Sequence, residues 1–439
     1  MSLMFSVSGL RGIVGKDLTT TIVSQYAQMF GTFAGPGAFV IGRDTRKSGP
    51  MFRRAVISGL NATGCTVIDL GIVPTPTVLF MVKKLKAQGG IAITASHNPI
   101  QWNALKFVTK RGQFLNEEEF KRLSRFVLKK DMLKGKTKPK KVTVLTKGED
   151  KHIETIISFF GKGLRKLRVG IDSVNGAGSI ALPKLLSKMG CTVYRLHCTF
   201  RPTFPRKPEP TPENIRSLCQ FVKKKKLDIG FAVDPDCDRL SVIDEKGRAI
   251  GEEKTLVLVT EYILNKTKGH VVTNLSTTAL MDYIVQKFNC HLYRTKIGEA
   301  NVVSKMKQVR AVIGGEGNGG VIYPKINYTR DALVGAAMIV TLMTESNKTV
   351  SEICEQYPTY YMVKKKLKKP RERLLDRRNK IINTFKGKIN TLDGLKITTS
   401  DYWLHIRPSQ TEPLIRIIGE ARNKVKINTY IKKVEAILK

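Results

Sequence analysis

The sequence predicts an α/β protein, because short apolar runs alternate with amphipathic segments along most of its 439 residues. Apolar runs of a few residues indicate buried strands, and apolar side chains spaced three or four apart indicate helices. Strands that alternate with helices predict βαβ units and mixed, mainly parallel sheets. Near the end of the chain, strand patterns follow one another directly, which predicts a smaller α+β domain.

The alternation repeats three times before the pattern changes. The first repeat carries helix patterns at 18–33, 51–62 and 77–85 and strand patterns at 38–41, 65–70 and 91–93. The next two carry strands at 167–172, 191–196, 228–233, 270–273, 290–293 and 309–313, with helices at 179–189, 254–264 and 277–288. The last part has helices at 371–386 and 425–438 and strands at 395–398, 402–407 and 414–419. We predict three α/β domains at 1–148, 149–250 and 251–362, with a lysine-rich connector at 134–141, and an α+β domain at 363–439.

The composition narrows the class of protein. The net charge is +40, which raises the possibility of a nucleic-acid partner. The lysines are scattered and aromatic residues do not alternate with them, so a solvated basic surface or a phosphorylated substrate explains the charge better, and we expect no specific nucleic acid. Seven dispersed cysteines predict free thiols in a reducing compartment. The sequence shows no signal-peptide pattern and no apolar run long enough to span a bilayer, so we expect a soluble cytoplasmic protein without a membrane partner.

A serine follows the strand predicted at 91–93. The segment 94–99 turns abruptly from apolar to small and polar residues, so the strand should deliver Ser96 into an exposed loop. A serine presented in this way is a candidate nucleophile, and His97 is a possible proton partner. An ordinary strand-to-loop turn also fits these residues, because Ser, Asn and Pro are common in turns.

An acidic loop follows the strand predicted at 228–233. Asp234, Asp236 and Asp238 alternate along it, and their mutual repulsion would be relieved by a divalent cation. An all-oxygen set of ligands suits magnesium, and the carboxyl ends of parallel strands are where such sheets bind ligands. The alternative is a solvated acidic turn.

Two further loops have the composition of ligand-binding segments. Glu316 and Asn318 lie in a glycine-rich loop after the strand predicted at 309–313, where they can accept and donate hydrogen bonds to sugar hydroxyls. The loop 407–416 offers two arginines and two hydroxyl groups as a cradle for phosphate. Taken alone, these are also an ordinary glycine-rich turn and an ordinary hairpin loop. Together, the four loops indicate phosphoryl transfer on a phosphosugar in one cleft.

The four loops, in this order, resemble those of the α-D-phosphohexomutases along the whole chain. The resemblance implies four domains around a central cleft, Mg²⁺ held by Asp234, Asp236 and Asp238, and a phosphoserine at Ser96 that also contacts the metal. It implies that a phosphosugar is converted through a sugar bisphosphate, which also acts as activator. It assigns the remaining site residues as well: Arg11, His97, Lys106 and Arg239 beside the serine, Glu316 and Asn318 on the sugar, and Arg407, Ser409, Gln410, Thr411 and Arg416 on the phosphate that is not transferred.

The departures from the family pattern concern the substrate. Many members have serine at the position of Asn318 and histidine at the position of Gly320. Many have glycine at the position of Ala104, and glycine or asparagine at the position of Gln410. Glu299 occupies a place where phosphoglucosamine mutases tend to have an acid, which could pair with a protonated amino group. We therefore expect a phosphoglucosamine mutase, which would catalyse a step of UDP-N-acetylglucosamine biosynthesis. We expect it to be active as a monomer or a homodimer. A phosphomannomutase/phosphoglucomutase is the alternative, and a nucleic-acid-binding protein or a catalytically silent scaffold are the competing classes.

Overall fold

The structure is a computed structural model that describes residues 3–128, 140–163, 165–409 and 414–439. Its contacts divide the chain into two units. Unit 1 consists of Met1–Tyr262 and Asn318–Glu352, and unit 2 consists of Ile263–Gly317 and Ile353–Lys439. Two helices run across the boundaries between the units, α8 (Glu252–Lys266) and α12 (Val350–Glu355). Each unit is therefore assembled from stretches that are far apart in the sequence.

The first sheet of unit 1 has a parallel half and an antiparallel half. Its strand order is β1-β2-β6-β5-β3-β4-β8, and β7 pairs with β6. The strands are β1 (Met4–Ser6), β2 (Gly9–Ile13), β3 (Ala38–Arg43), β4 (Thr66–Ile72), β5 (Gly89–Ile93), β6 (Trp102–Thr109), β7 (Gln113–Phe114) and β8 (Val142–Val144). The strand β3 is parallel to β4 and β5, whereas β6 is antiparallel to both β5 and β2. The sheet is thus mixed, as the sequence predicts.

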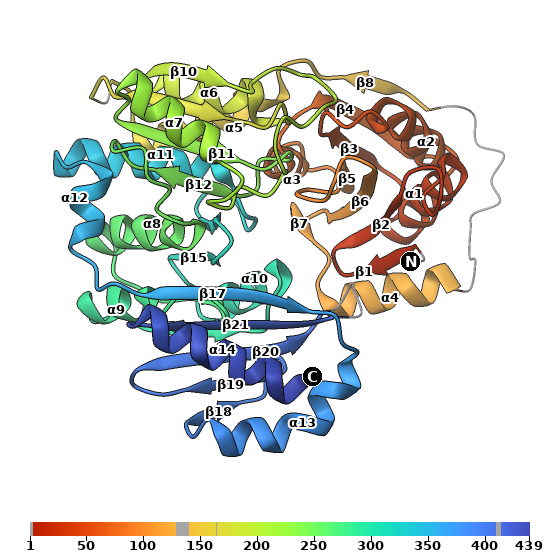
Figure 1. Ribbon diagram of the computed structural model, residues 1–439. Coiled ribbons are helices and arrows are strands. Elements are labelled where there is room, and N and C mark those ends of the chain that lie inside the picture. Colours follow the sequence, from red (N-terminus) through yellow and green to blue (C-terminus); the bar gives the residue numbers. More distant parts are fainter. Residues whose placement is uncertain (1–2, 129–139, 164, 410–413) are drawn as a thin grey trace. The chain divides into compact units, whose positions relative to one another are not determined.

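Helices cover both faces of this sheet (Figure 1). They are α1 (Thr20–Ala34), α2 (Gly49–Asn61), α3 (Thr75–Lys84) and α4 (Glu117–Leu128). Apolar side chains of α1, α2 and α4 form one core with the sheet, which includes Phe30 and Ile41. On the opposite face, Gly42 and Gly90 leave no room for a Cβ atom beside the valines of α3. Helix α3 therefore lies close against the sheet, with its first residues at the carboxyl ends of the strands.

The second sheet of unit 1 ends in the acidic loop. Its order is β10-β9-β11-β12, in which β9 is parallel to β10 and β11, and β12 is antiparallel. The strands are β9 (Arg168–Asp172), β10 (Thr192–Leu196), β11 (Ile229–Val233) and β12 (Leu240–Ile243). Unit 1 also contains α5 (Gly148–Phe160), α6 (Gly178–Lys188), α7 (Arg216–Lys225), β16 (Gly320–Ile322) and α11 (Ala332–Ser346). All five residues of β11 are buried, so this strand is a fixed support for the loop that follows it.

Unit 2 begins with a small parallel sheet. Its central strand β13 (Val271–Asn274) is flanked by β14 (Leu292–Thr295) and β15 (Ile313–Glu316), with α9 (Leu280–Lys287) and α10 (Glu299–Gln308) between them in the chain. The predicted strand 309–313 is misplaced, because Val309 is the C-terminal cap of α10, and the strand begins only at Ile313. The two glycines after Ile313 continue the strand, since Gly314 packs closely against Met306 and β13.

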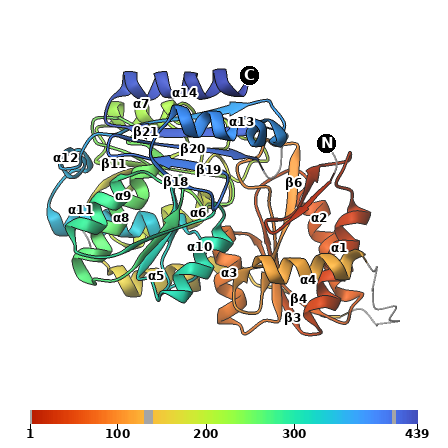
Figure 2. The same ribbon diagram turned by 90° about the horizontal axis from the view of Figure 1, so that it is seen from below.

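The C-terminal part of unit 2 is an antiparallel sheet with two helices. The order is β17-β21-β20-β19-β18. The elements are β17 (Tyr361–Leu367), α13 (Arg371–Thr384), β18 (Lys388–Asn390), β19 (Leu395–Thr398), β20 (Tyr402–Pro408), β21 (Ile415–Ala421) and α14 (Lys424–Leu438). Both helices share one apolar core with the sheet and cover the same face of it (Figures 1 and 2). The predicted α+β domain is present, but β17 begins before the predicted boundary at residue 363.

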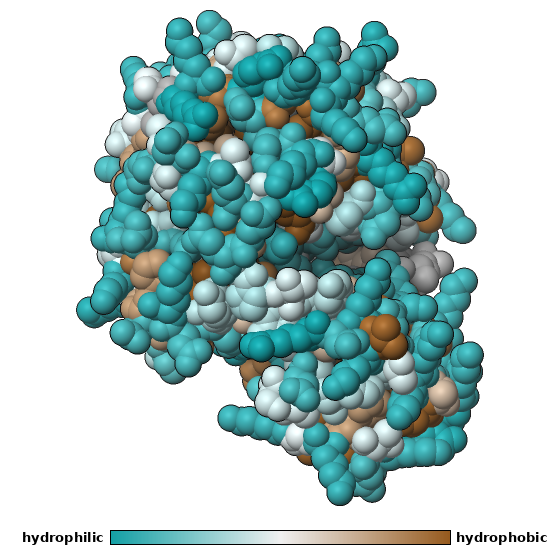
Figure 3. Space-filling model, turned by 60° about the vertical axis from the view of Figure 1, so that its left-hand side comes forward, coloured by the Kyte–Doolittle hydropathy of each residue, from teal (hydrophilic) through white to brown (hydrophobic). Residues whose placement is uncertain are grey.

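The polarity of the surface and the state of the cysteines match what the amino-acid composition predicts. The face in Figure 3 is mostly hydrophilic, with small separate apolar patches. All seven cysteines are free. In the described ranges, every helix is too short or too polar to cross a membrane.

Candidate functional site

Ser96 lies where the chain leaves the central strand β5. Thr94 Oγ1 accepts a hydrogen bond from the Ser96 N–H at 2.9 Å and donates one to Asp44 Oδ2 at 2.7 Å. The φ angle of Ser96 is 49°, in the left-handed region that non-glycine residues rarely adopt. The predicted exposed position is wrong, because Ser96 is only 4% exposed. Side chains from the acidic loop cover it.

Arg46 holds the segment around Ser96 in place. Its guanidinium group is fully buried and donates five hydrogen bonds. One goes to Asp44 Oδ2 at 2.9 Å, and the others go to the carbonyl oxygens of Ser96 (2.7 Å), Asn98 (2.7 Å), Pro99 (2.7 Å) and Trp102 (2.9 Å). Because a guanidinium group has five N–H donors in a rigid plane, it satisfies four backbone carbonyls and its own counterion at once. The loop is therefore fixed by one side chain.

The three acids after β11 converge, as predicted. Oxygen atoms of Asp234, Asp236 and Asp238 lie within 4.8 Å of one another, and all three residues are buried. Ser96 Oγ donates a hydrogen bond to Asp234 Oδ2 at 2.6 Å. Residues 138 positions apart in the chain are therefore in direct contact within unit 1.

Each of the other two acids has one satisfied and one unsatisfied oxygen. Asp236 Oδ2 accepts hydrogen bonds from Lys106 Nζ at 2.6 Å and Thr75 Oγ1 at 2.8 Å. Asp238 Oδ2 accepts one from Arg330 Nη2 at 2.7 Å. Among the described residues, the buried Oδ1 atoms of Asp236 and Asp238 accept no hydrogen bond, and Arg239 Nε lies 3.9 Å from Asp238 Oδ1. A buried carboxylate oxygen without a partner is costly, so this donor set fits a hard divalent cation.

The electrostatics of the cluster favour a cation as well. Burial raises the pKa of Asp234 well above its ordinary value, and the Asp236 and Asp238 carboxylates raise it further. Burial by itself would lower the pKa of Lys106, but the two carboxylates outweigh it, so that the pKa is raised. Burial opposes the charge of Asp236 too, yet the Lys106 ammonium group holds the pKa of this acid below its ordinary value. The ionised Asp236 thus depends on a nearby positive charge.

The remaining predicted residues of unit 1 lie beside Ser96. Arg11 Nη1 donates a hydrogen bond to Asn98 Oδ1 at 2.8 Å, and His97 Nδ1 lies 3.4 Å from Ser96 Oγ. Burial, followed by the charges of Arg239 and Arg11, lowers the pKa of His97 well below its ordinary value, so its ring is neutral. Arg239 Nη1 donates a hydrogen bond to Glu209 at 2.7 Å. Arg11, His97, Lys106 and Arg239 are therefore gathered around one serine.

The sequence reasoning missed four residues of this site. Asp44 and Arg46 lie in the segment 44–46 directly after β3, so their place at a strand end was a usable signal. Thr75 opens α3, and its N–H and hydroxyl groups both bind Asp236. Arg330 precedes Asp331, the N-terminal cap of α11, and nothing in the local sequence connects it with Asp238.

Unit 2 carries the predicted sugar-binding acids. Glu316 is the last residue of β15 rather than a loop residue, and its Oε1 accepts hydrogen bonds from Asn274 Nδ2 and the Gly298 N–H, both at 3.0 Å. Glu299 is the first residue of α10. Asn318 belongs to unit 1, where its Oδ1 accepts the Gly320 N–H at 3.2 Å. The carboxylate of Glu316 is thus fixed by its neighbours.

The predicted phosphate cradle connects β20 and β21. Arg407 and Arg416 are opposite each other in the antiparallel register of these strands. Arg407 Nε lies 3.3 Å from Asp393 Oδ2, and the Ser409 N–H donates to the Leu414 carbonyl at 2.8 Å. Gln410 and Thr411 lie outside the described residues. The two strands therefore bring the predicted arginines to one end of the sheet.

Known proteins resemble the chain over its full length. It matches three domains described as phosphoglucomutase/phosphomannomutase: alpha/beta/alpha domain I over residues 2–134, domain II over residues 150–247 and domain III over residues 252–361. A phosphoglucomutase/phosphomannomutase of Thermococcus kodakarensis is 36% identical, with 98% of this chain and 97% of that protein covered. A probable phosphoglucosamine mutase of Methanopyrus kandleri is 33% identical, with 97% and 95% covered. The crystal structure of a putative phosphomannomutase from Thermus thermophilus superposes with a TM-score of 0.85 at 25% identity, and both chains are covered completely.

Proposed function

The chain belongs to the phosphoglucomutase/phosphomannomutase family of phosphosugar mutases, and we propose that it interconverts glucosamine 6-phosphate and glucosamine 1-phosphate. The observation that carries the proposal is the hydrogen bond from Ser96 Oγ to Asp234 within a cluster of three buried acids. A serine in this environment is suited to carry a phosphoryl group, because a cation held by the acids would lie beside it.

The proposed reaction has two phosphoryl transfers. In the first, a sugar hydroxyl forms a bond to the phosphorus atom on Ser96 while the bond between this atom and Ser96 Oγ breaks, which gives a sugar bisphosphate. In the second, Ser96 Oγ forms a bond to the other phosphorus atom, and the sugar oxygen leaves. His97 Nδ1, 3.4 Å from Ser96 Oγ, is close enough to exchange a proton with the hydroxyl groups involved. Arg11, Arg239 and Lys106 offset the negative charge on the transferring group.

The same acids would hold the metal ion. Asp234, Asp236 and Asp238 offer three carboxylates, two of them with a buried oxygen that lacks a donor, and the Ser96 phosphate would be a further ligand. Bound Mg²⁺ supplies positive charge to the phosphoryl oxygens during transfer. Thr75 and Lys106 orient Asp236, and Arg330 orients Asp238, so the carboxylates are directed before any metal arrives.

The residues of unit 2 support glucosamine as the sugar. Glu299 follows Gly298 in the chain, and the Gly298 N–H donates a hydrogen bond to Glu316 Oε1. The two acids are therefore connected through one backbone hydrogen bond. A protonated amino group is favoured near such acids. We assign Arg407, Ser409, Gln410, Thr411 and Arg416 to the phosphate that is not transferred, and Asn318 to the sugar. Since one relative is a phosphoglucomutase/phosphomannomutase, mannose or glucose phosphate is the second candidate.

Replacement of the serine tests the mechanism. Ser96→Ala should abolish mutase activity in a coupled assay that contains a trace of sugar bisphosphate, and intact-mass spectrometry should find no phosphate on the variant. Ser187, an exposed serine on α6, supplies the control, because Ser187→Ala should retain both activity and phosphate. Full activity of Ser96→Ala would remove the phosphoserine mechanism.

Replacement of Glu299 tests the sugar. Relative kcat/KM values for glucosamine, glucose and mannose phosphates should favour glucosamine in the wild type. Glu299→Gln should reduce that preference by about tenfold, because one charge-assisted contact is worth roughly 1.5 kcal/mol. An unchanged preference would indicate that Glu299 does not contact the amino group, and a wild type that favours mannose or glucose would select the second candidate.

A further inference from the structure

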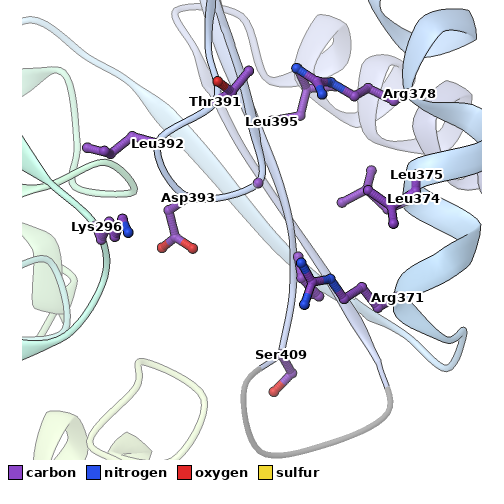
Figure 4. Close-up of a pocket in the computed structure, with 12 residues that line it drawn as sticks. Lys296, Arg371, Leu374, Leu375, Arg378, Thr391, Leu392, Asp393, Leu395 and Ser409 are labelled. Atoms are coloured by element: carbon purple, nitrogen blue, oxygen red, sulfur yellow. The ribbon is translucent and has the colours of Figure 1, made fainter. Parts of the chain in front are cut away.

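Unit 2 contains a cavity of about 580 Å³ between α13 and the turn that joins β18 to β19 (Figure 4). This volume is in the range of small-molecule sites in proteins, which measure roughly 300–1,000 Å³. One wall is a face of α13, and the other walls come from residues 391–395, Lys296 and the end of β20. Apart from Ser409, none of the lining residues belongs to the proposed mutase site.

The α13 wall has a regular pattern of charge and apolarity. Arg371 and Arg378 are seven residues apart, so they lie on the same face of the helix, about 10 Å apart along its axis. Leu374 and Leu375 lie between them in the sequence and line the same cavity. Figure 4 shows both guanidinium groups directed from the helix toward the strands. A ligand at this wall would meet two cationic groups separated by an apolar surface.

The positive charge of the cavity is not compensated. Asp393 is the acidic residue of the lining, and its Oδ2 is already occupied by the Ile297 N–H at 3.0 Å and by Arg407 Nε at 3.3 Å. Within the described part of the chain, no carboxylate forms an ion pair with Arg371, Arg378 or Lys296. Three cations that face one cavity without partners favour an anionic ligand.

The apolar part of the lining is also uncovered. Leu375 is 59% exposed and Leu392, in the opposite turn, is 48% exposed. Leu374, Leu395 and Pro408 extend the apolar surface. A sugar phosphate, whose hydroxyl groups need many polar partners, fits this lining poorly. A flat apolar ring attached to a phosphate fits it better, because the ring covers the leucines while arginine binds the phosphate through paired N–H groups.

We propose that this cavity binds a phosphorylated ligand of the nucleotide class, in which the base covers the leucines between Arg371 and Arg378, the phosphate lies at one of the two arginines, and the other arginine contacts the sugar and the base. The site goes beyond the mutase reaction and does not depend on it. Arg371 and Arg378 have no part in the proposed transfer, so the two functions are separable by mutation.

Isothermal titration calorimetry on the full chain tests the proposal. AMP and UMP should bind with Kd values below about 1 mM, and ribose 5-phosphate and inorganic phosphate should bind at least about tenfold more weakly. Arg378→Gln and Arg371→Gln should each weaken nucleotide binding by about tenfold or more. Arg377→Gln is the matched control, because it removes the same charge from the same helix at a position that does not line the cavity. It should bind nucleotide as the wild type does.

Four results would overturn the assignment. They are no measurable binding of either nucleotide, equal losses in Arg377→Gln and Arg378→Gln, inorganic phosphate binding as tightly as AMP, and complete displacement of AMP by glucosamine 6-phosphate. The mutase rate of Arg378→Gln without nucleotide should equal that of the wild type. A failure of the mutase proposal would appear in Ser96→Ala, whereas a failure of the present proposal would appear only in the titrations.

Discussion

At the scale of single residues, Thr75 connects the first sheet of unit 1 with the acidic loop. Its hydroxyl donates to Asp236 Oδ2 at 2.8 Å, and its N–H donates to the Asp236 carbonyl at 2.9 Å. Thr75→Val removes the hydrogen bond of the hydroxyl group but keeps the shape of the side chain and the hydrogen bond of the backbone N–H. Because partners of metal ligands typically contribute about 10- to 100-fold to metal affinity, the magnesium concentration for half-maximal rate should rise by at least about tenfold.

The conservative replacement separates orientation from packing. Thr75→Ser retains the hydroxyl group, so its magnesium titration should match that of the wild type. A titration of Thr75→Val that is also unchanged would show that Asp236 needs no help from Thr75 or does not bind the metal.

Arg46 should stabilise the loop of Ser96 mainly through the number of its hydrogen bonds, so that another cation cannot replace it. Lysine has three donors and cannot reach the four carbonyls and the carboxylate that Arg46 binds. Since each buried group without a partner costs roughly 1–3 kcal/mol, Arg46→Lys should lower the free energy of unfolding by about 3 kcal/mol or more. The mutase kcat should fall as well, because Ser96 would lose its fixed left-handed backbone.

Arg53 provides the comparison for this prediction. It pairs with Asp69 but is partly exposed, so Arg53→Lys should change the free energy of unfolding by less than about 1 kcal/mol. Urea denaturation of both variants measures the difference. Equal effects at the two positions would contradict a special role for Arg46.

At the scale of the element, β20 contains a buried histidine that makes unit 2 sensitive to acid. Ser276 Oγ lies 2.7 Å from His405 Nδ1, and the Asp393 carbonyl oxygen lies 2.5 Å from His405 Nε2. Burial lowers the pKa of His405 from 6.5 to about 4, the Asp393 carbonyl and carboxylate oppose this, and the charges of Lys396 and Arg407 add to it. Between pH 6.5 and about pH 4, His405 therefore binds a proton more readily in the unfolded chain than in the folded one.

The resulting stability is complete above about pH 6.5 and is lost as the pH falls toward 4. A difference of about 2.5 pKa units corresponds to roughly 3 kcal/mol. His405→Gln should remove this part of the pH dependence in urea denaturation between pH 7.5 and 4. His291→Gln, at an exposed histidine of the same unit, should retain it. A His405→Gln variant with the slope of the wild type would contradict the prediction.

The elements differ in how far the sequence reveals them. The strand that ends at Val233 is apolar throughout and is followed by three acids, so both the strand and its loop could be predicted from local pattern. The strand β15 could not be placed correctly, because its glycines have a low strand propensity and are retained for close packing. Helix α11 is buried on nearly all sides, so the amphipathic pattern that identifies surface helices is missing from its sequence.

At the scale of the whole molecule, the sequence identifies the residues that bear chemistry but not their partners. The convergence of Asp234, Asp236 and Asp238 follows from their spacing on one loop. The contacts of Arg330 with Asp238 and of Thr75 with Asp236 join segments 92 and 161 residues apart. Such contacts depend on the order of strands in the sheets and on the path of the connections, which periodicity does not determine. The left-handed backbone of Ser96 likewise results from Arg46 and Thr94, not from Ser96 itself.

The net charge of +40 leads to the last prediction. Cations scattered over a protein surface attract any polyanion, and this attraction weakens steeply as salt competes for the phosphates. A duplex of random sequence should therefore bind the protein at about 50 mM salt and be released by about 200 mM salt, with an affinity loss of roughly 10³-fold or more. Fluorescence anisotropy with two unrelated duplexes measures this, and equal affinities are expected. Binding that survives 200 mM salt or prefers one duplex would contradict a general charge effect and would restore nucleic acid as a specific partner of this chain.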